Sequence, residues 1–270
     1  MAIAKAGDLN IEYYLEGSGP PLLMIMGLGG QASSWGEPVL DGLQQHFTTI
    51  RFSNRGTGAT DKPADGYTIP QMADDAARLM DAIGIEKPHV FGISMGGMIA
   101  QEFVLNHPDR VQGLVLGCTN CGPAHSVTIP AETLAKFGQI MSLPVEERIR
   151  EFWNINVTPQ FIANGTTFLN HIMELGMATP TPVETFGRQF GAAQSFDTYD
   201  RLPQIKSPTL IIQGDMDALV PVENAEVLHG RIAGSRVRIV RGTGHCFFWE
   251  KPEEVVEEIV GFLSSVPVGA

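Results

Sequence analysis

The sequence predicts an α/β protein with a mostly parallel, doubly wound sheet and an inserted helical lid. Short apolar runs alternate with amphipathic helical stretches, the order expected of strands joined by crossover helices. The runs are apolar at consecutive positions, which is typical of strands buried on both faces. This alternation stops between residues 121 and 200, where helical patterns occur without a clear strand. The interruption predicts the lid.

The predicted strands are short runs bounded by glycine, proline or polar residues. Residues around Ile3 and 11–14 are expected to add an antiparallel edge to the sheet. The last helix is predicted to begin at Pro252, because proline and acidic residues favour a first helical turn. Parallel strands are predicted at residues 22–26, 48–52, 89–93, 112–117, 209–213 and 237–240, and further helices at residues 71–83 and 95–106.

These elements divide the chain into a core and a lid. Residues 1–120 and 201–270 are predicted to form the core, and residues 121–200 are predicted to form a helical lid inserted in it. The lid segment holds half of the phenylalanines and few charges. We expect it to cover the carboxyl ends of the strands, where sheets of this kind bind their ligands.

Charge and composition exclude several classes of function. A formal net charge of −12 argues against nucleic acid and anionic membrane surfaces as partners. The first residues lack an apolar segment of signal-peptide length, so a cytoplasmic location is expected. Three cysteines cannot form a disulfide framework, which agrees with that location. Cys118 and Cys121 have a spacing seen in metal sites, but too few partners remain, and we interpret them as packing residues.

The segment from Phe91 to Gly97 suggests a nucleophile. Ser94 lies between a predicted strand and a predicted helix, within the pattern Gly-x-Ser-x-Gly. A serine at such a corner has its hydroxyl exposed, and glycines on either side avoid clashes in the tight turn. The alternative is a glycine-rich turn with an idle serine. The strand–turn–helix setting favours the nucleophile.

A serine hydroxyl needs a base, and the base needs an acid that orients it. His245 follows the last predicted strand, at the sheet edge where Ser94 is expected. Asp215 and Asp217 follow the preceding strand at the same edge. Asp217 is the preferred acid because it lies further beyond the strand, whereas Asp215 is expected to stabilise the turn. The predicted catalytic residues are therefore Ser94, Asp217 and His245.

Acyl transfer through a serine also needs two donors for the oxyanion. The backbone amide of Met95, at the start of a helix, is predicted to be one. The other is placed at the amide of Leu28, in the glycine-rich loop 27–30 after the first parallel strand. That loop lacks the lysine of a phosphate-binding loop, so we do not interpret it as a nucleotide site.

Together these motifs make the chain resemble the α/β-hydrolase superfamily along nearly its whole length. The matching segments are the Gly27 loop, residues 54–58 with Asp61, the Ser94 turn, residues 214–221 and Gly244-His245. The resemblance is strongest to the serine esterase and lactonase branch, which includes 3-oxoadipate enol-lactonases, haloperoxidase-like esterases and acyl-homoserine lactone hydrolases.

The chain departs from this family's usual sequence at two positions. Met26 replaces the histidine that usually precedes the glycine of the oxyanion loop, and Ser53 replaces the aspartate of the Asp-x-Arg-Gly segment. A serine nucleophile also argues against the dehalogenase and epoxide-hydrolase chemistry of this superfamily, which uses an aspartate.

The expected activity is hydrolysis of esters or lactones with an apolar acyl group, N-acyl-homoserine lactones included, without a metal or organic cofactor. A carbon–carbon bond hydrolase of ring-cleavage diketo acids and a small-molecule receptor without turnover are the alternatives. Among the lid's few charges, Arg188 is expected to point inward. The residues predicted to bind substrate are Gly27, Trp153, Phe137, Met141 and Phe190.

Overall fold

The computed structural model describes residues 1–266 and contains a sheet of eight strands. The strand order is β1-β2-β4-β3-β5-β6-β7-β8. β1 and β2 form the predicted antiparallel edge, and from β4 to β8 every neighbouring pair is parallel. The strands are β1 Ala2–Ala6, β2 Leu9–Gly17, β3 Pro21–Ile25, β4 Thr48–Phe52, β5 His89–Ile93, β6 Leu114–Gly117, β7 Thr209–Gly214 and β8 Arg236–Val240.

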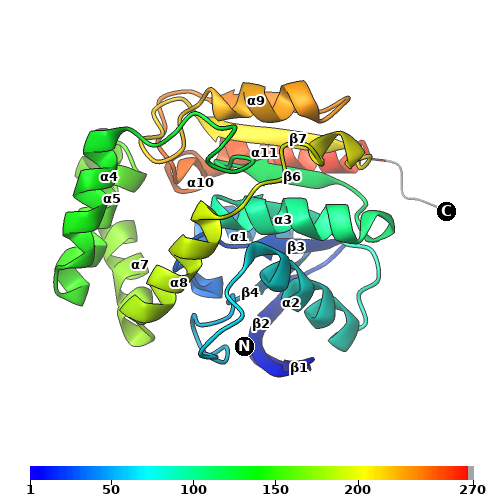
Figure 1. Ribbon diagram of the computed structural model, residues 1–270, viewed down its shortest axis with the longest axis horizontal. Helices are drawn as coiled ribbons and strands as arrows, with labels where there is room; N and C mark the ends of the chain where they lie inside the picture. The colour runs from blue at the N-terminus through cyan, green and yellow to red at the C-terminus, as the bar shows by residue number, and fades with distance from the viewer. Residues whose placement is uncertain (267–270) are drawn as a thin grey trace.

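Helices cover both faces of this sheet (Figure 1). On one face α1 (Glu37–Gln44) packs against α11 (Pro252–Ser264), and on the other α2 (Ile69–Ala82) packs against α3 (Met95–Asn106). The two faces have separate apolar cores, as a doubly wound sheet requires. The short helices of this core are α9 Asn224–Arg231, α10 Phe247–Glu250, η1 Ala32–Trp35, η2 Pro108–Arg110 and η3 Leu202–Gln204.

The segment between β6 and β7 is entirely helical, apart from its loops. It leaves the sheet and forms a separate group of helices at one end of the molecule (Figure 1). We retain residues 121–200 as the proposed bounds of this lid. Its helices are α4 Ala131–Met141, α5 Val145–Asn156, α6 Pro159–Asn164, α7 Thr166–Ala178 and α8 Val183–Gln194.

The parallel strands bring distant residues to one edge of the sheet. Ser94 directly follows β5, Cys118 follows β6, Asp217 follows β7 by three residues, and His245 follows β8. Neighbouring parallel strands end at the same edge, so these four side chains gather there, beneath the lid.

Ser53, which replaces the family's usual aspartate, hydrogen-bonds to Glu12 of β2. The Ser53 hydroxyl donates to Glu12 Oε2 at 2.8 Å, and this carboxylate oxygen also accepts the amide of Ala59 at 2.9 Å. Ser53 Oγ also accepts the amide of Ala32 at 3.0 Å. Ser53, which follows β4, and the amide of Ala59 therefore hold the buried carboxylate of Glu12 in this segment.

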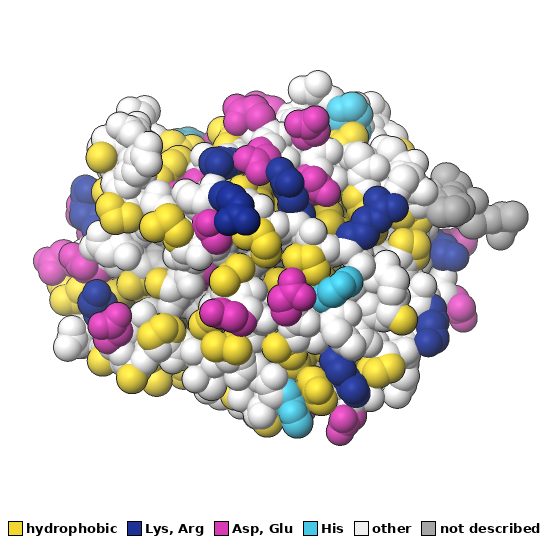
Figure 2. Space-filling view, turned by 90° about the horizontal axis from the view of Figure 1, so that it is seen from above, with side chains coloured by type: hydrophobic (Ala, Val, Ile, Leu, Met, Phe, Trp, Pro, Cys, Tyr) yellow, Lys and Arg dark blue, Asp and Glu magenta, His cyan; other side chains and the backbone are white. Residues whose placement is uncertain are grey.

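The surface seen in Figure 2 mixes basic and acidic side chains, with small hydrophobic areas between them. Within residues 1–266, no helix is long and apolar enough to cross a bilayer.

His89, at the start of β5, lowers the stability of the folded protein as the pH becomes acidic. It is 3% exposed, its Nδ1 has no hydrogen-bond partner within residues 1–266, and burial lowers its pKa from 6.5 to about 4. Above pH 6.5 the histidine is neutral in both states. As the pH falls from 6.5 to about 4, only the unfolded chain takes up this proton, so up to ~3 kcal/mol of stability is lost.

We therefore expect His89→Leu to flatten the pH dependence of unfolding between pH 6.5 and 4. Urea unfolding at several pH values would measure it, with the exposed His46→Gln as the matched control. An unchanged slope in His89→Leu would contradict this account.

Candidate active site

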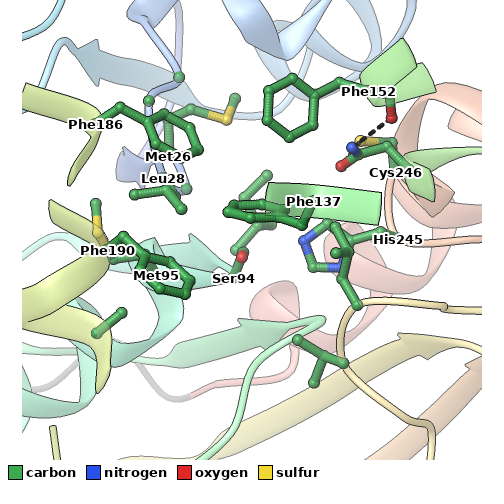
Figure 3. A pocket seen from close by; sticks show the side chains of 18 of the residues that line it. Met26, Leu28, Ser94, Met95, Phe137, Phe152, Phe186, Phe190, His245 and Cys246 are labelled. Carbon is green, nitrogen blue, oxygen red and sulfur yellow. Dashed lines mark hydrogen bonds between the residues drawn. The ribbon is translucent and has the colours of Figure 1, made fainter. Parts of the chain in front are cut away.

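Ser94 has a strained backbone at the junction of β5 and α3. Its φ of 54° and ψ of −125° lie in a region that residues with a side chain rarely adopt. The flanking glycines allow this turn. A Cβ atom on Gly92 would collide with the carbonyl oxygen of Gly96, and one on Gly96 would collide with that of Ile25. The turn directs the Ser94 hydroxyl into the cavity beneath the lid (Figure 3).

Asp217 and His245 form a buried pair. The imidazole Nδ1 of His245 donates to the Asp217 carboxylate at 2.7 Å, and the two residues are only 6% and 8% exposed. The other oxygen of Asp217 accepts the amides of Leu219 at 2.8 Å and Val220 at 2.9 Å. Gln213 donates a further bond of 2.9 Å to the oxygen that faces His245. These hydrogen bonds fix the carboxylate in direction.

Burial and the carboxylate act on His245 in opposite directions. Burial lowers the pKa of the imidazole, but the adjacent Asp217 and Cys118 together outweigh it and raise the pKa well above the ordinary value of 6.5. The raised pKa means that the site stabilises the protonated imidazole. This is the form that a general base takes after it accepts a proton.

The second carboxylate of this turn has a different contact. Asp215 accepts the backbone amide of Gly242 at 2.6 Å, in the loop that follows β8. It joins two neighbouring loops and does not contact His245 in the hydrogen bonds of residues 1–266. Of the two candidates in the sequence, Asp217 is the one beside the histidine.

The lid holds the loop that contains His245. The amide of Gly244 donates to Glu250 at 2.7 Å, and the other oxygen of Glu250 accepts the amide of Thr158 at 3.1 Å. The amide of Cys246 donates to the carbonyl of Asn156 at 2.8 Å. Residues of the lid therefore fix the backbone on both sides of the imidazole.

A cavity of about 610 Å³ lies between the sheet edge and the lid. Ser94, Met95 and His245 line it, together with Leu28 from the glycine-rich loop. Figure 3 shows these side chains facing one space, with aromatic rings from the lid around it. All five residues predicted to bind substrate also line this cavity, namely Gly27, Phe137, Met141, Trp153 and Phe190.

The prediction for Arg188 is wrong. Its guanidinium lies on the surface, where it donates to the carbonyl of Pro63 at 3.2 Å and lies near Glu184. Arg148 of α5 lines the cavity instead. The helical face of an arginine could not be assigned from the lid sequence, because its apolar pattern did not separate the two faces.

The thiol of Cys118, interpreted from sequence as a packing residue, lies within 4.8 Å of a ring nitrogen of His245. Within residues 1–266, only Cys118, Asp217 and His245 bring three possible metal ligands together, with their ligand atoms within 4.8 Å of one another. Thiolate, carboxylate and imidazole suit Zn²⁺. A bound cation would occupy the groups through which Asp217 orients His245, so metal binding and the Asp217–His245 bond exclude each other.

We expect Zn²⁺ to inhibit turnover, and Cys118→Ala to raise the half-inhibitory concentration by ~10-fold or more through loss of one ligand. Each variant is compared with its own uninhibited rate, and Cys121→Ala, which removes another buried thiol, is the control. Equal inhibition of all three proteins would contradict a role of Cys118 as ligand.

The chain matches the model of the α/β hydrolase fold family over residues 20–138 and 177–252. It belongs to this family.

Several relatives align along 90% or more of the chain. A protein of Azorhizobium caulinodans, named as a carbamate hydrolase, is 29% identical over 98% of this chain and 99% of its own length. A poly(3-hydroxyalkanoate) depolymerase of Ectopseudomonas oleovorans is 29% identical over 90% of this chain and 84% of its own length. The solved structure of Est816, described as an N-acyl homoserine lactone degrading enzyme, has a TM-score of 0.79 and 26% identity over 97% of this chain and 100% of its own.

Proposed function

We propose that this α/β hydrolase cleaves esters or lactones with an apolar acyl group, N-acyl-homoserine lactones included. One observation supports the proposal above the others. The strained Ser94 and the buried Asp217–His245 pair open onto the same large apolar cavity (Figure 3).

The proposed reaction proceeds through an acyl-enzyme. Ser94 Oγ attacks the carbonyl carbon while His245 Nε2 takes the hydroxyl proton, and Asp217 stabilises the imidazolium that results. The amides of Met95 and Leu28 bind the negative oxygen of the tetrahedral intermediate. His245 then gives its proton to the leaving alkoxide. A water molecule, deprotonated by His245, releases the acid and restores Ser94.

The cavity wall favours an apolar acyl chain over a small polar substrate. Rings of Phe137, Phe152, Phe186 and Phe190 pack against one another with centroid distances of 5.3–5.8 Å, and all four line the cavity. A carbamate group alone would leave most of the 610 Å³ without contact. The cavity therefore suits a hydroxyalkanoate ester or an N-acyl lactone, as named for two of the relatives, better than the carbamate named for the third.

A second candidate, hydrolysis of a carbon–carbon bond in a diketo acid, has one supporting observation. Arg148 is the charged side chain of the lid that lines the cavity, and within residues 1–266 it has no carboxylate within 4.0 Å. A substrate carboxylate would supply that partner.

A substrate panel would separate these candidates. Initial rates would be measured with C2–C12 aryl esters, N-acyl-homoserine lactones, an uncharged lactone, an alkyl carbamate and a diketo acid. Our proposal predicts ester or lactone turnover that increases from C2 to the medium-chain esters. Turnover of the diketo acid alone, sensitive to Arg148→Met, would favour the second candidate. Ligand binding without turnover of any substrate would favour a receptor and overturn the hydrolase proposal.

A further inference from the structure

The glycine-rich loop that supplies the proposed oxyanion amide is held by the lid. Both polar groups of Gly29, the residue after Leu28, bond to lid side chains. The Gly29 amide donates to Gln189 Oε1 of α8 at 2.8 Å, and the Thr181 hydroxyl donates to the Gly29 carbonyl at 2.9 Å. Within residues 1–266, neither polar group of the Gly29 backbone hydrogen-bonds to the core.

Gln189 is itself held tightly. Its side chain is 0% exposed, and its amide nitrogen donates to the carbonyl of Arg55 at 3.0 Å. Arg55 in turn donates two bonds, of 2.6 Å and 2.8 Å, to the buried carboxylate of Asp75. The side-chain oxygen of Gln189 thus accepts from the glycine-rich loop, and its side-chain nitrogen donates to the core. A continuous set of buried polar contacts runs from Asp75 through Gln189 to Gly29.

Two further contacts fix the same loop. Gln31 and the lid residue Thr179 bond reciprocally, with the Thr179 hydroxyl donating to Gln31 Oε1 at 2.6 Å and Gln31 Nε2 donating to the Thr179 carbonyl. The ring of Phe186, one helical turn before Gln189, lies where a Cβ atom on Gly29 would be, and Gly29 has a φ of 69°. Only glycine fits this position.

We infer that Gln189 is a positioning residue for the oxyanion amide of Leu28. The bond to the Gly29 amide fixes the peptide plane between residues 28 and 29 and so restrains the adjoining plane between residues 27 and 28, which carries the Leu28 N–H. This role matters because Met26 cannot order the loop with a polar side chain, and Gln189 supplies that function from the lid. The inference rests on the proposed hydrolase function and adds the lid to its catalytic machinery.

Gln189→Met tests the inference, because methionine keeps the length of the side chain and removes both hydrogen bonds. We expect kcat to fall ~10- to 50-fold, less than the ~10²- to 10³-fold cost of losing an oxyanion donor itself. KM should change little, since ground-state contacts remain. Gln160→Met is the matched control: Gln160 is an exposed glutamine of the lid helix α6, does not line the cavity, and makes no side-chain hydrogen bond within residues 1–266.

Inhibitor binding separates positioning from a general structural role. A trifluoromethyl ketone that adds to Ser94 forms an oxyanion, whereas the product carboxylic acid does not form a tetrahedral adduct. Gln189→Met should weaken the ketone by the same factor as kcat and leave binding of the product acid unchanged. Equal weakening of both inhibitors would overturn the inference and indicate damage to the whole cavity.

Gln189→Glu provides a rescue that depends on pH. A protonated carboxyl group reproduces the amide, with one oxygen accepting from Gly29 and the other donating to Arg55. A carboxylate cannot donate to the carbonyl of Arg55. The ratio of kcat for Gln189→Glu to kcat for Gln189→Met should therefore be well above one at low pH and fall as the pH rises.

A flat ratio of one across the pH range, or wild-type kcat in Gln189→Met, would overturn the positioning role. If Gln189→Met does not fold, Thr181→Val is the alternative, because it removes the other bond to Gly29 at a more exposed position. These outcomes differ from failure of the proposed function, in which the wild-type protein itself would show no turnover.

Discussion

Ser94→Ala is expected to lower kcat for esters and lactones by about 10⁴- to 10⁶-fold while the protein remains folded. The acyl-enzyme cannot form without Oγ, and the residual rate would come from binding and from the oxyanion amides alone. The measurement is the initial rate on the best ester of the panel, with the active sites of wild type titrated by a phosphonate. Wild-type turnover in Ser94→Ala would exclude this serine as nucleophile.

Ser94→Gly is the matched variant, since it also lacks the hydroxyl but tolerates the backbone. With a φ of 54°, Ser94 and an alanine at its position are both strained, whereas glycine is not. We expect Ser94→Gly to be as inactive as Ser94→Ala and more stable by about 1 kcal/mol in urea unfolding. Equal stability of the two variants would show that the turn stores no strain.

The fold was largely predictable because buried parallel strands leave a local signal. A strand covered on both faces must be apolar at nearly every position, as residues 89–93 are, and all five are buried in β5. Strand order and chain direction then place the residues that follow each strand at one edge. This is why Ser94, Asp217 and His245 could be proposed together although more than a hundred residues separate the first two.

The contacts made by the lid could not be predicted in this way. Gln189 lies between Arg188 and Phe190 on α8, and nothing local distinguishes it from Gln194 on the same helix. Its partner Gly29 is 160 positions away, so the bond depends on how the lid docks on the core. The same reason applies to Arg188, whose predicted inward direction was wrong, and to Glu250, which meets Thr158 across 92 positions.

Cys118 was missed for another reason. The spacing of Cys118 and Cys121 is seen in metal sites, but too few partners remain in the sequence, which therefore predicts two packing residues. Packing does explain its complete burial, but its neighbour is the imidazole of His245. The order of β5, β6 and β7 in the sheet was the signal that could have found this contact, since the residue after β6 must lie between those after β5 and β7.

Asp217→Asn is expected to lower kcat by about 10⁴-fold with little change in KM. The reason lies in the direction of the new amide. Its oxygen would accept the amides of Leu219 and Val220, as the carboxylate does, so its NH₂ group would face His245 Nδ1. His245 would then accept at Nδ1 and carry its proton on Nε2, where it cannot take the proton of Ser94.

The pH profile gives an independent test of this mechanism. Asp217 raises the pKa of His245 against the effect of burial, so wild-type kcat/KM should increase with pH through a value well above 6.5. Without the carboxylate, burial is left to lower that pKa, and the remaining activity of Asp217→Asn should reach its plateau at lower pH. Asp215→Asn, whose side chain bonds Gly242 instead of the imidazole, should keep the wild-type profile. A profile that shifts in Asp215→Asn and stays unchanged in Asp217→Asn would reverse the assignment of the acid.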